Sequence, residues 1–189
     1  SMSDVLGTIF AEAVPHAEEN ARAFDLGREL IRSEFDNDPY LHQFEALKAT
    51  LIEKRDIVVT TGTGSGKSLC FILPLLVNLM MEGIGAGGRR PWKSKKSDKD
   101  WWRKGENPYS YRRGSDRTTA VRGLVIYPLN ALVRDQIETM RGLLDSPAAE
   151  SFYREALGDD RIYFGQYVGA TPGKATPVND RELSKAREF

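Results

Sequence analysis

The chain has one cysteine, no secretory signal and no long apolar run. The single thiol, Cys70, can form neither an internal disulfide nor a cysteine-based metal cluster, so we expect it to be a small buried hydrophobe. A membrane helix needs about 18 or more consecutive apolar residues, and none is present. These absences predict a soluble, cytoplasmic protein with no membrane partner.

The chain also lacks an excess of either charge, because 27 Lys and Arg residues balance 27 Asp and Glu residues. The distribution is uneven: residues 84–122 hold twelve basic and four acidic residues, together with all three tryptophans. A connection of this length is an insertion with a purpose or a flexible arm. Basic residues interleaved with aromatics suit nucleic acid, but the tryptophans could equally pack back on the domain.

A chain of 189 residues, 40% of them hydrophobic, can bury one substantial core. Residues 5–35 show helical periodicity, broken at Pro15, with an apolar stripe in the second half at Phe24, Leu26, Leu30 and Ile31. We therefore expect an N-terminal helical appendage over 1–38, followed by one α/β domain over 39–189.

The stretch from Asp56 to Ser68 predicts a buried strand, a glycine-rich turn and the start of a helix. Such a turn directs backbone N–H groups and a helix N-terminus at one anion. Lys67 would reach the β- and γ-phosphates of a nucleotide, and Ser68 would supply a hydroxyl to Mg²⁺. The predicted phosphate-binding residues are Thr61, Gly62, Thr63, Gly64, Ser65, Gly66, Lys67 and Ser68.

The loop TGTGSGKS has Thr61 where the general phosphate-loop pattern has glycine. In this it resembles the first motif of superfamily 2 helicases and translocases, and GKSLCFILPLL resembles the corresponding piece of the RecQ family. The resemblance implies ATP and Mg²⁺ as cofactors. The apolar helix after Ser68 is expected to pack under a parallel sheet.

PYLHQFEAL, about two dozen residues before Lys67, resembles the adenine-reading Q motif of the same superfamily. The resemblance makes Gln43 the adenine reader and Tyr40 the residue that stacks on the base. Leu41, Phe44, Leu47 and Leu51 are expected on the buried face of this helix, whereas His42 is expected to be structural.

Residues 123–128 predict a second buried strand, and an amphipathic helix follows. YPLNALVRDQ resembles motif Ia of superfamily 2 helicases, which implies nucleic-acid contacts at Asn130, Ala131, Leu132 and Gln136. After a short helix beginning at Pro147, residues 161–168 predict a third strand. The turn that follows resembles the family's nucleic-acid-side turn and adds Gly169 and Thr171.

Together these motifs predict an incomplete three-layer α/β/α RecA-like lobe of an ATP-dependent helicase. No Asp-Glu motif follows, so we expect an N-terminal fragment without its second RecA-like lobe, inactive alone, from a bacterial phage-defence helicase acting on DNA or RNA, with DNA favoured. Two alternatives stay open: a nucleotide-gated nucleic-acid-binding module without hydrolysis, and a phosphate-loop kinase or GTPase-like switch.

Overall fold

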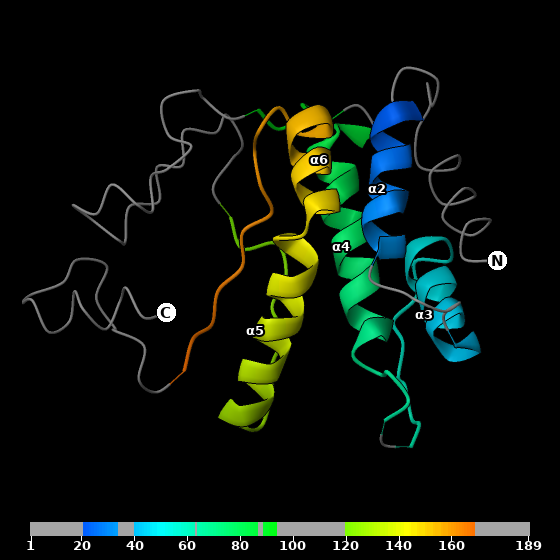
Figure 1. Cartoon of the computed structure of the whole chain (residues 1–189). Helices are drawn as coiled ribbons and strands as arrows, with labels where there is room; N and C mark the ends of the chain where they lie inside the picture. The colour runs from blue at the N-terminus through cyan, green and yellow to red at the C-terminus, as the bar shows by residue number, and fades with distance from the viewer. Residues whose placement is uncertain (1–20, 34–39, 63, 87–88, 94–119, 169–189) are drawn as a thin grey trace, which may run out of the picture.

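The computed structural model describes residues 21–33, 40–62, 64–86, 89–93 and 120–168. Helices in these ranges surround one hydrophobic core (Figure 1). Their bounds are α2 Ala21–Ser33, α3 Leu41–Leu51, α4 Leu69–Gly83, α5 Asn130–Leu144 and α6 Pro147–Ala156.

Helix α4 is the centre of the core. Its sequence is apolar on nearly every side, and the structure buries Ile72, Leu73, Leu76, Val77 and Met80. α3 packs along it, and α2 also contacts it. No helix in the described part of the chain is long and apolar enough to cross a membrane.

The predicted apolar stripe of the N-terminal region is confirmed within α2, where Phe24, Leu26, Leu30 and Ile31 are all buried in the common core. α2 packs mainly against α6, from far along the chain, and Arg22 donates to Glu155 at 3.1 Å across that contact. Residues 21–33 are thus an integral part of the core. The predicted domain boundary at residue 38 lies in a range that is not described and stays a prediction.

The predicted short helix after Pro147 is confirmed as α6. Ser146 caps it by accepting the Ala149 N–H at 3.1 Å, and Pro147 occupies the first turn, where a missing N–H costs nothing. The Tyr153 hydroxyl donates to the Leu144 carbonyl at 3.1 Å, which ties α6 to the end of α5. The predicted amphipathic helix is likewise confirmed as α5.

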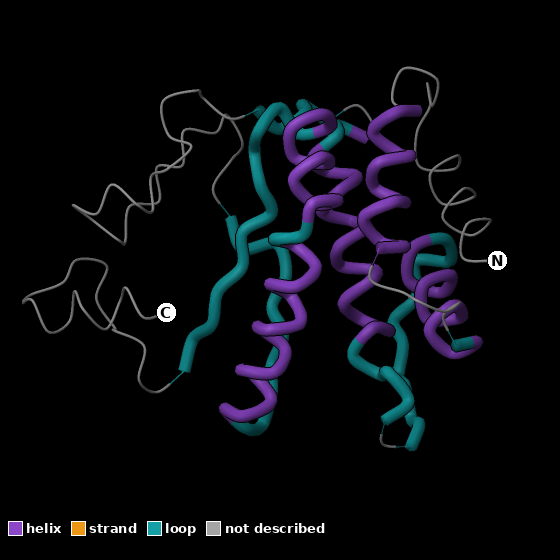
Figure 2. Tube along the Cα trace, in the orientation of Figure 1, coloured by secondary structure: helices purple, strands orange, loops and turns teal. Residues whose placement is uncertain are grey.

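The three predicted strands, by contrast, are not formed: in the described ranges the chain has helices and loops (Figure 2). Residues 57–59 and 123–128 were expected to be buried, yet Val58 is 92% exposed and Ile126 is 82% exposed. In residues 161–168, Ile162 is buried but Tyr167 is exposed. A parallel strand is stable only where neighbouring strands satisfy its N–H and C=O groups, and a β-branched sequence cannot supply those neighbours by itself. α4 therefore packs against helices and not under a sheet.

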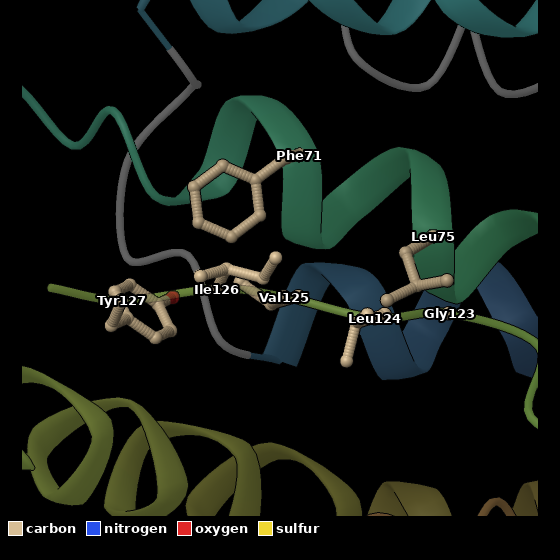
Figure 3. Close-up of a pocket in the computed structure, with 7 residues that line it drawn as sticks. All are labelled: Phe71, Leu75, Gly123, Leu124, Val125, Ile126 and Tyr127. Atoms are coloured by element: carbon tan, nitrogen blue, oxygen red, sulfur yellow. The ribbon is translucent and has the colours of Figure 1, made fainter.

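The segment 123–127 lies along one side of α4 and encloses with it an open apolar pocket of about 380 Å³ (Figure 3). Phe71 and Leu75 line it from the helix, and Gly123, Leu124, Val125, Ile126 and Tyr127 line it from the segment. None of these residues has a charged side chain, so the pocket is unsuited to a triphosphate. It marks incomplete packing between an apolar segment and its helix.

Candidate nucleotide-binding site and nucleic-acid corner

The glycine loop joins the extended segment after α3 to the first turn of α4. Gly64 and Gly66 have φ of 75° and 70°, the left-handed region that glycine adopts without strain. Gly66 has a second constraint, because a Cβ there would lie 2.4 Å from Gln43 Nε2. At Gly62 and Gly64 the corresponding space is open. A ligand can therefore approach the loop backbone closely at these two positions.

Side chains of the loop form hydrogen bonds within the loop itself. Lys67 Nζ donates to the Thr61 carbonyl at 2.8 Å and also to the Gly62 carbonyl. The Thr61 and Ser65 hydroxyls lie 2.6 Å apart, and Ser65 Oγ donates to the Gly62 carbonyl at 2.9 Å. Thr61, the departure from the general pattern, thus contributes a hydroxyl bridge that glycine cannot make.

Helix α3 holds the other side of the loop through two consecutive side chains. Gln43 is 2% exposed; its Nε2 donates to the Gly66 carbonyl at 2.9 Å, and its Oε1 accepts the Tyr40 N–H at 3.0 Å. His42 Nε2 lies 2.9 Å from the Ser65 carbonyl. A carbonyl only accepts, so His42 Nε2 carries the proton. The predicted Q-motif region and the predicted phosphate loop are therefore one connected structure.

Tyr40 is largely exposed at the start of α3, and its ring stacks on that of His42 at 5.7 Å with an interplanar angle of 10°. The expected buried face of α3 is correct for Leu47 and Leu51 but wrong for Leu41, which is exposed. α3 begins directly after Tyr40, so Leu41 lies in its first turn.

Cys70 is buried, as expected, with Sγ 4.0 Å from the His42 carbonyl. Burial raises the pKa of its thiol above the ordinary value, which keeps it protonated and unreactive. Cys70 therefore packs α4 against the start of α3.

Ser68 precedes α4, and its hydroxyl makes no capping bond to that helix. No cluster of His, Cys, Asp or Glu side chains suited to a metal ion is found among the described residues. Mg²⁺ in nucleotide sites takes most of its ligands from water and phosphate oxygens, so a single protein hydroxyl fits it. The role of Ser68 as the Mg²⁺ ligand stays a prediction.

The predicted nucleic-acid corner forms the exposed start of α5. Asn130, Ala131 and Leu132 all lie at the surface, while the Oε1 of Gln136 is buried without a described hydrogen-bond partner. Among the described residues, no hydrogen bond or ion pair joins this corner to the glycine loop. Gly169 and Thr171 lie outside the described residues, as does Thr63 of the loop.

The two ends of the basic insertion meet at a neck formed by Trp92, Arg122 and Glu82. Trp92 is 3% exposed, and its backbone N–H donates to the Gly83 carbonyl at 2.8 Å. The Arg122 guanidinium lies 5.4 Å from the centre of the Trp92 ring and donates from Nε to Glu82 at 2.7 Å. For Trp92, packing against the domain is confirmed. The other two tryptophans lie outside the described residues.

A glycine loop between an extended segment and an apolar helix, with lysine and serine at its helical end, defines the class of P-loop nucleotide-binding proteins. The chain matches the DEAD/DEAH box helicase family over residues 40–179, and it belongs to that family. The resemblance to superfamily 2 helicases is thereby confirmed, and a phosphate-loop kinase or GTPase-like switch is excluded. Members of the family use ATP.

Two curated relatives are similar to parts of the chain. Druantia protein DruE from Escherichia coli is 32% identical over 135 residues, which is 71% of this chain and 6% of that protein. ATP-dependent RNA helicase DBP9 from the yeast Lodderomyces elongisporus is 42% identical over 53 residues, 28% of this chain and 9% of that protein. The chain thus spans less than a tenth of either relative. No solved structure matches it.

Proposed function

We propose that this chain is the ATP-binding part of an ATP-dependent DNA or RNA helicase or translocase. The observation that carries the proposal is the pair of hydrogen bonds from His42 and Gln43 of α3 to successive loop carbonyls. They connect the segment predicted to read the base with the loop predicted to bind phosphate, although the two are far apart in the sequence. The family match itself supports a helicase-type function that uses ATP.

ATP would bind with its triphosphate at the glycine loop. Lys67 would exchange the carbonyls of Thr61 and Gly62 for phosphate oxygens, which are better partners for an ammonium because the hydrogen bonds are charge-assisted at both ends. The open space at Gly62 and Gly64 admits the phosphates. Ser68 would contribute one ligand to Mg²⁺.

The adenine would lie beside Tyr40, which is exposed, and Gln43. An amide has two N–H donors and an oxygen with two lone pairs, so Gln43 keeps one donor and one acceptor site beyond its two backbone bonds. That pair matches the N7 acceptor and N6 donor of adenine. Gln43 would then bind the base and the loop together.

Nucleic acid would bind at the corner formed by Asn130, Ala131 and Leu132, with Gln136 in support. The first three residues of α5 are exposed, and helix-start amides suit backbone phosphates. Gly169 and Thr171 are proposed for the same face. In the whole protein we propose that residues 57–59, 123–128 and 161–168 form the sheet of a three-layer RecA-like lobe, opposed by a second lobe.

We favour DNA as the nucleic acid and a bacterial phage-defence helicase as the parent protein. The excess of basic residues in 84–122 supports a nucleic-acid partner, and the similarity to an Escherichia coli protein supports a bacterial parent protein.

The test is titration of the 189-residue chain with ATP and Mg²⁺ by calorimetry, comparing wild type with Lys67→Ala. Losing a charge-assisted contact should raise the Kd at least about 10- to 100-fold. Lys48→Ala, a surface lysine on α3 with only a weak ion pair to Glu53, should bind like wild type. Equal affinity of wild type and Lys67→Ala would refute the nucleotide site.

A further inference from the structure

His42 lies against the phosphate loop, although its sequence position is one residue away from the expected base reader. Its Nε2 donates to the Ser65 carbonyl at 2.9 Å, next to the bond from Gln43 to the Gly66 carbonyl. The imidazole stacks on the Tyr40 ring, with 5.7 Å between the ring centres. The backbone of His42 also contacts α4, because the Cys70 thiol lies 4.0 Å from the His42 carbonyl.

Peptide geometry determines where the amides of the phosphate loop point. In a trans peptide the C=O and the following N–H point in opposite directions. A Ser65 carbonyl held toward α3 therefore turns the Gly66 N–H away from α3, and a Gly66 carbonyl held toward α3 does the same for the Lys67 N–H. Two successive amides then face the same side, the arrangement that binds phosphate oxygens.

We propose that His42 is a positioning residue for the phosphate loop, which fixes the Gly66 amide in the orientation that binds the nucleotide's phosphates. This role rests on the proposed ATP site and adds a specific residue to it. His42 touches no phosphate; it acts through the Ser65–Gly66 peptide. The effect should be the same for every nucleoside triphosphate, because the base is not involved.

Two substitutions separate hydrogen bonding from packing. His42→Phe keeps a ring against Tyr40 but has no donor, whereas His42→Gln supplies an N–H donor without the ring. Glu45→Ala, at an exposed position on the same helix, is the matched control. Each variant is titrated with ATP·Mg²⁺ and GTP·Mg²⁺ as the 189-residue chain, and its melting temperature is measured. In the free protein, the backbone amide resonance of Gly66 is followed by NMR.

We expect His42→Phe to raise the Kd about three- to ten-fold for both nucleotides, in keeping with the loss of one hydrogen bond, and to shift the Gly66 amide resonance. His42→Gln should restore both towards wild type, and Glu45→Ala should change neither. Wild-type affinity and an unmoved Gly66 resonance in His42→Phe would overturn the role. So would a loss that tracks melting temperature and is not rescued by glutamine. If the wild-type chain bound no nucleotide, the proposed function would fail, and this role with it.

Discussion

The phosphate loop and the nucleic-acid corner are both family motifs, yet they differ in how much of the surrounding chain holds them. Loop carbonyls accept hydrogen bonds from four side chains, those of His42, Gln43, Ser65 and Lys67, and α3 packs on α4. The corner at Asn130 follows a segment that is largely exposed and forms no strand in the described residues. One motif is thus held by helices that are close to it in the chain, while the other follows a segment that we propose to be part of a sheet in the whole protein.

The largest expected difference is in how much a leucine near each motif contributes to the free energy of unfolding. Leu76 of α4 is fully buried in the core, whereas Leu124, in the segment before the corner, is 79% exposed. Leu76→Ala should reduce the free energy of unfolding by about 2–5 kcal/mol, through lost burial and a cavity. The same substitution at Leu124 should change it by less than about 0.5 kcal/mol. Chemical denaturation of both variants measures this.

A large effect at Leu124 would contradict the comparison. It would mean that residues 123–128 are buried in solution, as a formed sheet would require.

Removing residues 94–119 tests whether the basic insertion binds nucleic acid. The neck of Trp92, Arg122 and Glu82 stays in the chain, and a short Gly/Ser linker joins its two sides. The domain should remain folded, because the buried Trp92 is retained. Affinity for single-stranded DNA should fall about ten-fold or more at low salt, with a shallower salt dependence, since fewer counterions are released.

The matched control for that deletion is Trp92→Ala in the intact chain, which removes the neck's buried ring and keeps every basic residue. It should lower the melting temperature without changing the salt slope. Unchanged affinity and slope in the deletion variant would show that residues 94–119 do not bind the nucleic acid.

The helices could be predicted from sequence because their signals are local. The stripe of Phe24, Leu26, Leu30 and Ile31, the cap at Ser146 and the glycine loop each act within a few residues. The strands could not, because strand pairing depends on distant segments. His42 was missed as a contact because its partner is a backbone carbonyl, which no pattern of side chains reveals. The position of the Trp92–Arg122 neck was missed for a similar reason: its residues come from opposite ends of the insertion.

Gln43 has an observed contact with the Gly66 carbonyl and a proposed role in reading the base, and one substitution separates the two. Gln43→Ala removes the bond to the Gly66 carbonyl, which should weaken ATP and GTP alike by about five-fold, the value of one neutral hydrogen bond. If Gln43 also reads the base, ATP should lose additional affinity. Calorimetry with both nucleotides measures the two parts. An equal loss for both would reject base reading and leave the loop contact.

The smallest effect is expected at the nucleic-acid corner, from Asn130→Ala. Asn130 is exposed at the first position of α5, so the substitution should leave stability unchanged within about 0.5 kcal/mol and ATP affinity unaltered. Its amide is neutral and would donate to a single backbone phosphate, so affinity for single-stranded DNA should fall only about two- to five-fold, equally for all sequences. The salt slope should stay constant, because no cation is removed.

Fluorescence anisotropy at several salt concentrations measures both the affinity and the salt slope. Arg134→Ala on the same helix is the contrast, since losing a phosphate-bound cation would reduce the slope by about 0.9. DNA affinity unchanged by either substitution would place the nucleic-acid contact elsewhere than on the start of α5, and the corner would then be a feature of the fold alone.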